Sequence, residues 1–543
     1  MQRSVRLRPW QKRALDRLAE TGAADTLVVA TPGAGKTTFA LTAALRELSE
    51  RPGHRLIVVA PTAHLKLQWA QAAERLGLHL EPQWQSGTPL PVDMHGIVVT
   101  YQQVASAPAA LRAAAGRAVV ILDELHHAGD DRAWGDAVRE AFEPAPRRLA
   151  LSGTPFRSDT RAIPFVRYHL DEAVADFEYG YGDALRDRRV VRPVYFPRIN
   201  GFMEWMAPDG AVLSASFDDA LDRVRSAQRL RTALSLEGEW LPTVLVQAHR
   251  QLVALRRDQP DAGGLVIATD REHAHGVADL LRKRCGVDAV VVTSDDPMAS
   301  HRIARFAGSD APWIVAVRMV SEGVDIPRLR IGVYATTTAT DLFFRQAVGR
   351  LVRWTGAVAQ EKAYFFIPDD PRLRGWAQQI ADQRRHSLRT RADDMASDSE
   401  PEADGSALDA QVHEEDQQLS LFAALSAVAD EGPHPVASVF DEALDDDGAE
   451  DDDDPSLALL LAPPPLPDGR MPGVGGPSRR EVKASLRDRN AVLARELARF
   501  TGLTHAQVNG KLNQLAGLQR IGEATLEQLE SRAHQAERWL KAL

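Results

Sequence analysis

The chain has 543 residues, a length for which about three or four domains are expected rather than one hydrophobic core. Apolar residues make up 44% of it, but no apolar run approaches the roughly 18 residues of a membrane span, and the first residues lack a secretory apolar core, so neither a span nor a signal is expected. The single cysteine, Cys285, excludes an internal disulfide and any multi-cysteine metal site and predicts a cytoplasmic location.

The net charge of −10 is distributed unevenly along the chain. Residues 393–469 hold 23 Asp and Glu and no Lys or Arg, so the rest of the chain carries +13, the difference between −10 and −23. A basic remainder is suited to binding phosphate groups. The overall acidity therefore does not exclude a nucleic-acid partner.

Two series of short β-branched apolar runs alternate with helical stretches. Such alternation predicts an α/β fold with two doubly wound parallel sheets, in domains at residues 1–160 and 262–392. The runs expected to be strands lie at residues 26–30, 56–60, 96–100, 118–123 and 147–154 in the first domain, and at 263–269, 288–293, 313–317, 330–336 and 362–368 in the second.

A glycine-containing turn follows the first of these strands, in "LVVATPGAGKTTFAL". Gly33 and Gly35 allow backbone N–H groups to curve around a phosphate, and Lys36 can reach the β and γ phosphates of a nucleotide. The Thr37 hydroxyl can bind Mg²⁺ where the next helix begins. Ala30 replaces the first glycine of the general P-loop pattern. The strand before and the helix after the turn favour a nucleotide-binding loop over a chance glycine-rich turn.

Adjacent carboxylates close a later strand, in "RAVVILDELHH". Asp123 at the carboxyl end of this strand can reach Mg²⁺, directly or through water, and Glu124 can polarise the attacking water. Alone, an acidic pair after a strand is more often a solvated turn. Downstream of a phosphate loop, it predicts a site of nucleotide hydrolysis.

Three further segments complete the expected organisation. Residues 161–261 are expected to form a connector with an embellishment packed on the domains, and residues 393–476 a disordered, acidic, Pro/Gly-rich linker. Within that linker, the apolar stretch "LSLFAALSAVA" is expected to be helical. The acidic run is either a passive solvated tether or a mimic of nucleic acid.

Residues 477–543 are expected to form a small helical domain. "ELARFTGLTHAQVNGKLNQL" has the spacing of a helix-turn-helix, with Gly502 at the turn and Val508 and Leu512 packing the second helix on the first. Gly510 weakens this interpretation, because a glycine within a helix costs about 1 kcal/mol relative to alanine. A plain helical bundle that binds a protein partner or the rest of the chain is the alternative.

The ordered motifs of the first domain resemble those of superfamily 2 helicases of the DEAD/DEAH-box type. "LRPWQ" is similar to the adenine-recognition element, "TPGAGKT" to motif I, "VVAPTAHLKLQW" and "VVTYQQV" to motifs Ia and Ib, "DELHH" to motif II and "LSGTPFR" to motif III. The resemblance implies that Gln11 reads adenine and that motifs Ia and Ib contact the nucleic-acid backbone. It also implies that His126, Ser152 and Thr154 couple hydrolysis to strand contacts.

The second domain continues the resemblance. "GLVIATDREHA" is similar to motif IV, "VRMVSEGVDIP" to motif V and "FFRQAVGRLVR" to motif VI. The resemblance implies two RecA-like domains in tandem, with Gly323 and Asp325 near the ribose of the nucleotide. It places Gln346, Arg350 and Arg353 opposite the γ phosphate, where arginines stabilise the transferring phosphoryl group when the domains close.

The predicted function is an ATP- and Mg²⁺-dependent helicase or translocase, most similar to the restriction-subunit and DNA-repair branch. Gln346 and "DELHH" favour DNA over RNA as the partner, and the alternative is a nucleotide-switched DNA clamp recruited by the carboxyl-terminal module. The predicted site comprises the catalytic residues Glu124, Gln346, Arg350 and Arg353, the nucleotide-binding residues Gln11, Gly33, Gly35, Lys36, Thr37, Thr38, Gly323 and Asp325, the Mg²⁺ ligands Thr37 and Asp123, and the coupling residues His126, Ser152 and Thr154.

Overall fold

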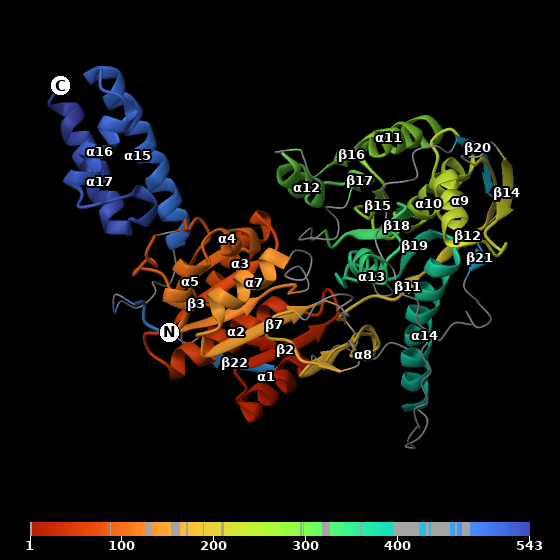
Figure 1. The fold of residues 1–543 in the computed structure, drawn as a ribbon, viewed down its shortest axis with the longest axis horizontal. Coiled ribbons are helices and arrows are strands. Elements are labelled where there is room, and N and C mark those ends of the chain that lie inside the picture. Colours follow the sequence, from red (N-terminus) through yellow and green to blue (C-terminus); the bar gives the residue numbers. More distant parts are fainter. Residues whose placement is uncertain are drawn as a thin grey trace. The chain divides into compact units, whose positions relative to one another are not determined.

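The computed structural model describes most of the chain, which Figure 1 shows as a ribbon. The described residues are 3–86, 88–125, 132–153, 163–169, 172–187, 189–207, 211–293, 296, 298–317, 326–358, 361–394, 423–429, 434–435, 457–461, 464–467, 469 and 478–543. Contacts divide the chain into two compact units, the first comprising Met1–Val29, Gly35–Glu178 and Glu450–Leu543, and the second Ala30–Ala34 and Tyr179–Ala449. Each unit has its own parallel sheet and hydrophobic core.

The first unit is built on a sheet with the strand order β10-β2-β7-β6-β3-β5-β4. The pairs from β2 to β4 along this order are parallel. All five apolar runs expected in this domain lie on these strands, and their nearly continuous burial is the pattern of a parallel sheet covered on both faces. The strands are β2 (Asp25–Ala30), β3 (Arg55–Ala60), β4 (Leu80–Glu81), β5 (Gly96–Thr100), β6 (Ala118–Leu122), β7 (Arg147–Ser152) and β10 (Phe177–Tyr179).

Helices alternate with these strands, as expected for a doubly wound fold. Thr62 and Thr100 cap two of them, because their side-chain oxygens accept hydrogen bonds from backbone amides in the first turn. The helices are α1 (Pro9–Thr21), α2 (Lys36–Glu50), α3 (Ala63–Arg75), α4 (Tyr101–Ser106), α5 (Pro108–Ala115) and α7 (Arg132–Phe142). A short hairpin of β8 (Tyr168–His169) and β9 (Glu172–Ala173) precedes β10.

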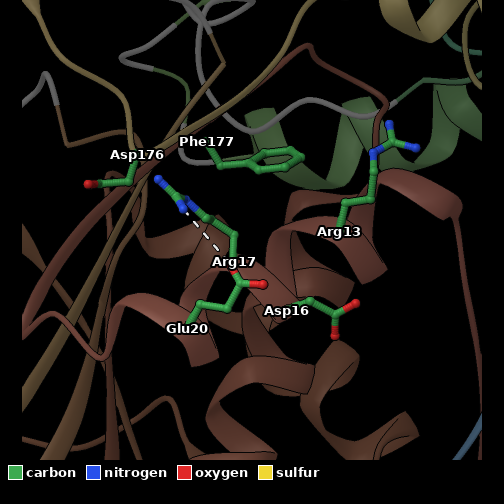
Figure 2. Close-up of a pocket in the computed structure, with 6 residues that line it drawn as sticks. All are labelled: Arg13, Asp16, Arg17, Glu20, Asp176 and Phe177. Atoms are coloured by element: carbon green, nitrogen blue, oxygen red, sulfur yellow. Dashed lines mark ion pairs between the residues drawn. The ribbon is translucent and has the colours of Figure 1, made fainter.

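A surface pocket lies beside α1 and the start of β10 (Figure 2). Arg17 and Glu20 within it form an exposed ion pair at 3.7 Å, and Asp176 accepts a hydrogen bond from the Leu27 amide at 2.8 Å. The lining residues are Arg13, Asp16, Arg17, Glu20, Asp176 and Phe177, none of which is a predicted site residue. This pocket is therefore separate from the candidate site described below.

The second unit contains a sheet with the order β16-β17-β15-β18-β19-β12-β21, and β11 also pairs with β19. The five runs expected in this domain form its parallel centre, from β16 to β19. Gly264 lets β15 and β17 lie together, since a Cβ atom there would come within 2.4 Å of the Trp313 ring. The strands are β11 (Val194–Tyr195), β12 (Pro197–Ile199), β15 (Gly263–Ala268), β16 (Ala289–Val292), β17 (Trp313–Val317), β18 (Leu329–Ala335), β19 (Ala363–Pro368) and β21 (His434–Pro435).

An antiparallel sheet with the order β14-β13-β20 and a set of helices complete the second unit. The strands are β13 (Gly201–Met206), β14 (Val212–Ser216) and β20 (Ala423–Ala429). The helices are α8 (Tyr181–Arg186), α9 (Arg223–Ala233), α10 (Trp240–Leu255), α11 (Arg271–Cys285), α12 (Ala299–Ala307), α13 (Asp341–Gly349) and α14 (Pro371–Asp394).

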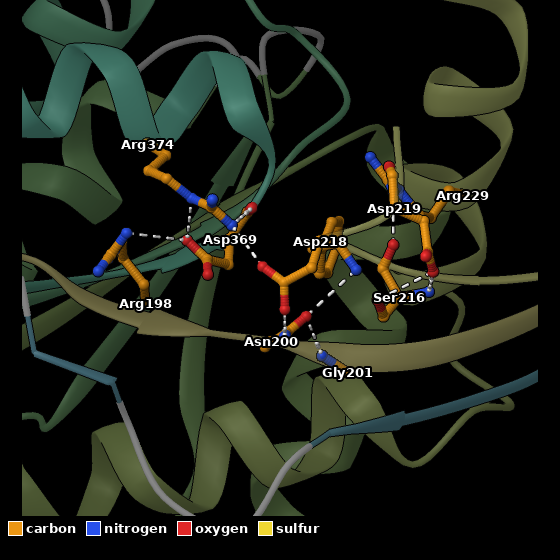
Figure 3. Close-up of polar contacts among 10 residues, drawn as sticks. Arg198, Asn200, Gly201, Ser216, Asp218, Asp219, Arg229, Asp369 and Arg374 are labelled. Carbon is orange, nitrogen blue, oxygen red and sulfur yellow. Dashed lines mark hydrogen bonds and ion pairs between the residues drawn. The ribbon is translucent and has the colours of Figure 1, made fainter. Parts of the chain in front are cut away.

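Polar contacts attach the β13–β14 hairpin to the end of the parallel sheet (Figure 3). Arg374 of α14 donates hydrogen bonds to Asp369 at 2.9 Å and to Asp218 at 3.1 Å, and Asp218 also accepts one from Asn200 at 2.6 Å. The buried Arg229 of α9 donates to the carbonyl oxygen of Asp219 at 2.8 Å. Of residues 161–261, expected as connector and embellishment, the part up to Glu178 thus belongs to the first unit and the part from Tyr179 to the second.

Two short segments within residues 393–476 differ from what the sequence predicts. Ala423–Ala429, expected to be helical, forms strand β20 against β13. Leu457–Leu461, expected to lie in a disordered linker, forms β22, which pairs antiparallel with β1 (Arg3–Leu7). Apart from residues 423–429, 434–435, 457–461, 464–467 and 469, the expected linker after Asp394 lies outside the described residues.

The last helices of the chain form one bundle, α15 (Arg479–Thr501), α16 (His505–Leu515) and α17 (Leu526–Lys541), with a short 3-10 helix at Ile521–Glu523 (Figure 1). Gly502 ends α15 with a φ of 68°, and Val508 and Leu512 are buried in one cluster with residues of that helix; whether these helices act as a helix-turn-helix or as a plain bundle stays a prediction. Helix α16 continues through the exposed Gly510.

A buried polar network joins the three helices of the bundle. The guanidinium of Arg532 donates hydrogen bonds to the side-chain oxygens of Asn490, Asn509 and Asn513 at 2.9, 2.7 and 2.9 Å. Both Arg532 and Asn490 are buried. Because each donor has a defined acceptor, the network specifies one arrangement of the helices.

The bundle is held to the first unit by buried charges. Lys483 of α15 and Asp93, in the loop before β5, form an ion pair at 2.9 Å with side chains that are 1% and 3% exposed. Asp93 also accepts a hydrogen bond from the Leu526 amide at 3.2 Å. Arg487 pairs with Glu81 of β4 at 2.9 Å. The bundle is therefore part of the first unit rather than a loosely tethered tail.

His273 is expected to make the second unit sensitive to acid. Its ring accepts a hydrogen bond from the Thr269 amide at 3.3 Å and donates one to the Leu234 carbonyl at 2.8 Å, so the neutral form is required. Burial lowers the pKa of His273 below its ordinary 6.5, despite the opposing effects of that carbonyl and of Asp270. The stability that neutral His273 contributes is complete above pH 6.5 and is lost as the pH falls through its lowered pKa.

Thermal denaturation tests this prediction. Between pH 7.5 and pH 5, the Tm of the wild type should fall further than that of His273→Gln. His275→Gln is the matched control, because His275 is exposed on the same helix. An equal fall in the wild type and His273→Gln would contradict the assignment.

Candidate functional site

The turn between β2 and α2 has the conformation expected of a phosphate-binding loop. Gly33 and Gly35 have φ angles of 82° and 93°, which favour glycine. Helix α2 begins at Lys36, so Lys36, Thr37 and Thr38 occupy its first turn, where unpaired amides and the helix dipole attract anions. The loop and its three polar residues lie together as the sequence predicts.

Gln11 of α1 braces this loop. Its side-chain oxygen accepts a hydrogen bond from the Arg8 amide at 2.8 Å, and its side-chain nitrogen donates one to the Gly35 carbonyl at 2.9 Å. A Cβ atom on residue 35 would lie 2.8 Å from that nitrogen, so the close approach requires glycine. The structure thus places Gln11 beside the loop, and its reading of adenine remains a prediction.

Asp123 is held in place at the carboxyl end of β6. It is 8% exposed, and its carboxylate accepts a hydrogen bond from the Trp69 indole at 2.7 Å. The Tyr101 hydroxyl donates to the Asp123 carbonyl at 2.9 Å. Burial raises the pKa of Tyr101 well above its ordinary value, and the charges of Asp123 and Glu124 act in the same direction. The phenol therefore stays protonated as a donor.

Glu124 connects the phosphate loop with the end of β7. One carboxylate oxygen accepts a hydrogen bond from Lys36 Nζ at 3.0 Å, and the other accepts one from the Gly153 amide at 2.9 Å. Glu124 also has a φ of 46°, an uncommon backbone conformation for a residue with a side chain. Two separate donors therefore hold the predicted water-activating carboxylate between motif I and motif III.

The oxygen donors near the loop fit Mg²⁺. Thr37 offers a hydroxyl and Asp123 a carboxylate, the hard oxygen ligands that Mg²⁺ prefers beside nucleotide phosphates. Among the described residues there is no cluster of three or more His, Cys, Asp or Glu that could hold a metal ion by itself. The donor set is suited to a metal that is bound jointly with phosphates.

The segments that resemble motifs Ia and Ib are joined by a side-chain contact. Lys66 of α3 is 9% exposed, and its Nζ donates to the Gln103 side-chain oxygen at 2.8 Å. Gln103 also takes part in the capping box that begins α4. This contact therefore joins the first turns of α3 and α4.

The second unit carries the residues of motif VI on and just after α13. Gln346 lies on this helix, Arg350 caps its carboxyl end, and Arg353 follows three residues later. All three side chains are half-buried. An isolated antiparallel bridge pairs the backbone of Arg353 with Val191. The main chain at Arg353 is therefore fixed from within the second unit.

The remaining predicted residues are only partly described. Ser152 is fully buried at the end of β7. His126, Thr154, Gly323 and Asp325 lie outside the described residues. The sequence favoured packing in the core or at the nucleotide edge for Trp69, and it did not predict the contacts of Trp69, Tyr101 or the Gly153 amide with the acidic pair. No pattern in the chain indicates which side chain or amide will face a carboxylate.

Comparisons with known proteins identify several related chains. Residues 4–157 match the family model described as type III restriction enzyme, res subunit. An uncharacterised protein of Mycobacterium tuberculosis is 48% identical over 390 residues, which cover 70% of this chain and 64% of that protein. A protein of Mycobacterium leprae is 45% identical over 390 residues, which cover 70% of this chain and 65% of that protein. The chain thus spans slightly less than two thirds of the length of these curated relatives.

More distant similarities include viral and restriction proteins. A protein assigned as a helicase of a Sulfolobus islandicus filamentous virus is 24% identical over 259 residues, covering 46% of this chain and 42% of that protein. A fragment assigned to the HsdR subunit of a type I restriction enzyme from Vibrio vulnificus aligns with a TM-score of 0.48 and 17% identity, over 68% of this chain and 65% of that chain. The resemblance to superfamily 2 helicases is confirmed. No described helix is both long and apolar enough to cross a bilayer.

Proposed function

The chain carries a superfamily 2 helicase core, and from this premise we propose that it is an ATP-dependent motor that translocates along or unwinds nucleic acid, with DNA preferred to RNA. One observation carries the proposal. Glu124 joins Lys36 of the phosphate loop to the Gly153 amide of motif III, so a change at the nucleotide can be passed to a neighbouring motif. We propose the cytoplasm as its location, because the chain has a single cysteine.

In this proposal, the loop residues Gly33, Gly35, Lys36, Thr37 and Thr38 bind the phosphates, and Gln11 positions the loop and reads the base. Bound ATP and Mg²⁺ would supply the phosphoryl group and a Lewis acid that neutralises its developing charge. Thr37 and Asp123 would hold the metal. Glu124 orients the attacking water and accepts its proton once a phosphate has replaced this carboxylate as the partner of Lys36.

The second domain contributes groups that respond to the nucleotide. Arg350 and Arg353 would stabilise charge on the transferring phosphoryl group, with Gln346 beside them, and Gly323 and Asp325 would approach the ribose. Because such arginines act only when the domains close, hydrolysis would alternate closed and open states. This alternation would change the affinity of the protein for the nucleic-acid strand through the coupling residues His126, Ser152 and Thr154.

The preference for DNA rests on motif details and on the relatives. Gln346 and "DELHH" differ from the usual motifs of DEAD-box RNA helicases. The matching family model is described as the res subunit of a type III restriction enzyme. The motor would contact mainly the phosphate backbone, so it should show little sequence preference and strong salt dependence.

Steady-state ATP hydrolysis measured with single-stranded, duplex and forked DNA and with RNA tests this function. We expect hydrolysis to be stimulated most by DNA and to be lost in Lys36→Ala, because the amine that contacts the phosphates is removed. Lys12→Ala, at an exposed position of α1, should retain the activity of the wild type. Absence of hydrolysis in the wild type, or its survival in Lys36→Ala, would overturn the proposal.

A nucleotide-switched DNA clamp is the second candidate, favoured by the firm attachment of the carboxyl-terminal bundle to the first unit through Lys483 and Asp93. In this role the bundle would select a DNA site or protein partner. ATP would control the affinity of the protein for DNA, and the protein would not translocate along it. Displacement of the third strand from a DNA triplex separates the candidates. A motor displaces it in an ATP-dependent manner, whereas a clamp hydrolyses ATP without displacing it.

A further inference from the structure

A buried arginine lies behind the motif VI segment of the second unit. Arg192 is fully buried, and its backbone amide donates to the Val352 carbonyl at 2.6 Å. Its guanidinium donates to the carbonyls of Leu329 at 3.2 Å and Pro327 at 3.0 Å. One residue thus contacts the chain just before Arg353 and the chain at the end of motif V.

Glu361 is the partner of this arginine. Its carboxylate lies 2.8 Å from Arg192 Nη2, and neither side chain is exposed. The same carboxylate accepts hydrogen bonds from the Thr355 amide at 3.1 Å, the Thr355 hydroxyl at 2.6 Å and the Ala357 amide at 3.0 Å. Glu361 therefore holds the chain just after Arg353.

Electrostatics makes this pair interdependent. Burial lowers the pKa of Arg192 to about 10, with Glu361 opposing that effect and Arg330 and Arg353 adding to it. Arg330 is also buried and is likewise influenced by Glu361. The negative charge of Glu361 thus offsets the positive charges of Arg192 and Arg330. Loss of either member of a buried ion pair leaves a buried charge without its partner.

Arg353 lies between these two sets of contacts. On one side, the Val352 carbonyl accepts from Arg192 and the backbone of Arg353 is bridged to Val191. On the other side, Thr355 and Ala357 are bound by Glu361. The main chain before Arg353 is thus bonded to the backbone of residues 191 and 192, and the main chain after it to the Glu361 carboxylate. The Arg192–Glu361 ion pair joins these two anchors and lies outside every recognised motif.

We propose that the Arg192–Glu361 ion pair is a positioning element for Arg353. It joins Arg192, whose backbone amide bonds the chain before this arginine, to Glu361, whose carboxylate bonds the chain after it, so that the guanidinium is presented to the phosphoryl group in one orientation. The inference rests on the proposed function, in which Arg353 stabilises the transition state. A charged, multiply bonded pair is suited to this task because its directional hydrogen bonds specify a backbone path, which apolar packing does not.

Kinetics of two conservative variants test the proposal. Arg192→Lys keeps the charge but loses the forked geometry, and Glu361→Gln keeps an acceptor but loses the charge. Each should lower the kcat of DNA-stimulated ATP hydrolysis by about 10- to 100-fold, because a displacement of about 1 Å at a catalytic group has effects of this size. The Kd of a fluorescent ATP analogue should change less than about twofold, since the phosphate loop lies elsewhere in the chain.

The decisive measurement repeats both substitutions in an Arg353→Lys background. If the pair acts through Arg353, Arg192→Lys should lower kcat by less than about twofold there, because effects that share one route are not additive. A pair that only stabilises the fold should give the same fold-change in both backgrounds. That result, or an unchanged kcat in both single variants, would overturn the proposal.

Arg229→Lys is the matched control, since Arg229 is also fully buried in the second unit and also donates to main-chain carbonyls (Figure 3). It should leave kcat within about twofold of the wild type. A loss equal to that of Arg192→Lys would contradict a specific role for the pair. Failure of the proposed function is distinguishable, because the wild type would then lack DNA-stimulated hydrolysis altogether.

Discussion

Glu124→Gln should lower the kcat of ATP hydrolysis by about 10²- to 10⁴-fold, the range typical of removing a general base. The amide can still accept a hydrogen bond from the Gly153 amide, but it cannot take a proton from water. The substitution also removes the ion pair that Glu124 forms with Lys36 at 3.0 Å. We therefore expect ATP to bind at least as tightly as to the wild type.

Steady-state hydrolysis with DNA and titration with a fluorescent ATP analogue measure the two effects separately. Glu140→Gln is a suitable control, because Glu140 is exposed on α7 of the same unit. Weaker nucleotide binding in Glu124→Gln would show that the carboxylate mainly supports the loop. Undiminished hydrolysis would remove Glu124 from the catalytic set.

Lys483→Met should destabilise the first unit by about 3–5 kcal/mol, the cost of leaving one member of a buried ion pair without its partner. Asp93 is 3% exposed and would keep the Leu526 amide, at 3.2 Å, and Arg479, at 3.8 Å, as its partners among the described residues. Burial lowers the pKa of Lys483, against the opposing effect of Asp93. The methylene stem is retained in methionine, so the loss reports mainly on charge.

Urea denaturation followed by tryptophan fluorescence measures this free energy of unfolding. Adding Asp93→Leu to Lys483→Met should restore much of it, because an apolar pair in a buried site is often as stable as the ion pair. Arg489→Met is the control: its partner is Glu537, its side chain is 59% exposed, and the loss should stay below about 1 kcal/mol. A similarly small loss for Lys483→Met would show that the bundle is only loosely attached.

This attachment affects how the carboxyl-terminal module is studied. Deleting residues 477–543 would leave Asp93 and Glu81 without Lys483 and Arg487. A loss of activity in such a truncation would then report damage to the first unit as well as loss of the module. Substitutions on the exposed side of the bundle, such as Phe500→Ser at a side chain that is 70% exposed, avoid this problem.

The central strands could be predicted because the information for them is local. Runs such as Leu56–Ala60 and Trp313–Val317 are continuous in β-branched and apolar residues, which is the pattern of strands buried on both faces. The phosphate loop was predicted for a related reason. Its glycines, lysine and threonine are adjacent in the chain, so spacing alone specifies their chemistry.

The helix expected in the linker shows where local preference fails. Alanine and leucine in "AALSAVA" favour a helix, yet Ala423–Ala429 pairs with β13. Strand formation depends on the unpaired edge that β13 offers, and that edge is made by residues 201–206, more than 200 positions earlier. No window of sequence around residue 425 contains this partner.

The amino-acid sequence by itself determined the elements and motifs whose chemistry lies within one short stretch, including the loop at Lys36, the carboxylates after β6 and the helices around Gly502. Only the tertiary structure decided which polar groups meet. The contacts of Trp69 with Asp123, Gly153 with Glu124, Lys483 with Asp93 and Arg192 with Glu361 join residues 54, 29, 390 and 169 positions apart. Such pairs are selected by burial, where a charge or donor must find its partner, and burial is a property of the folded chain.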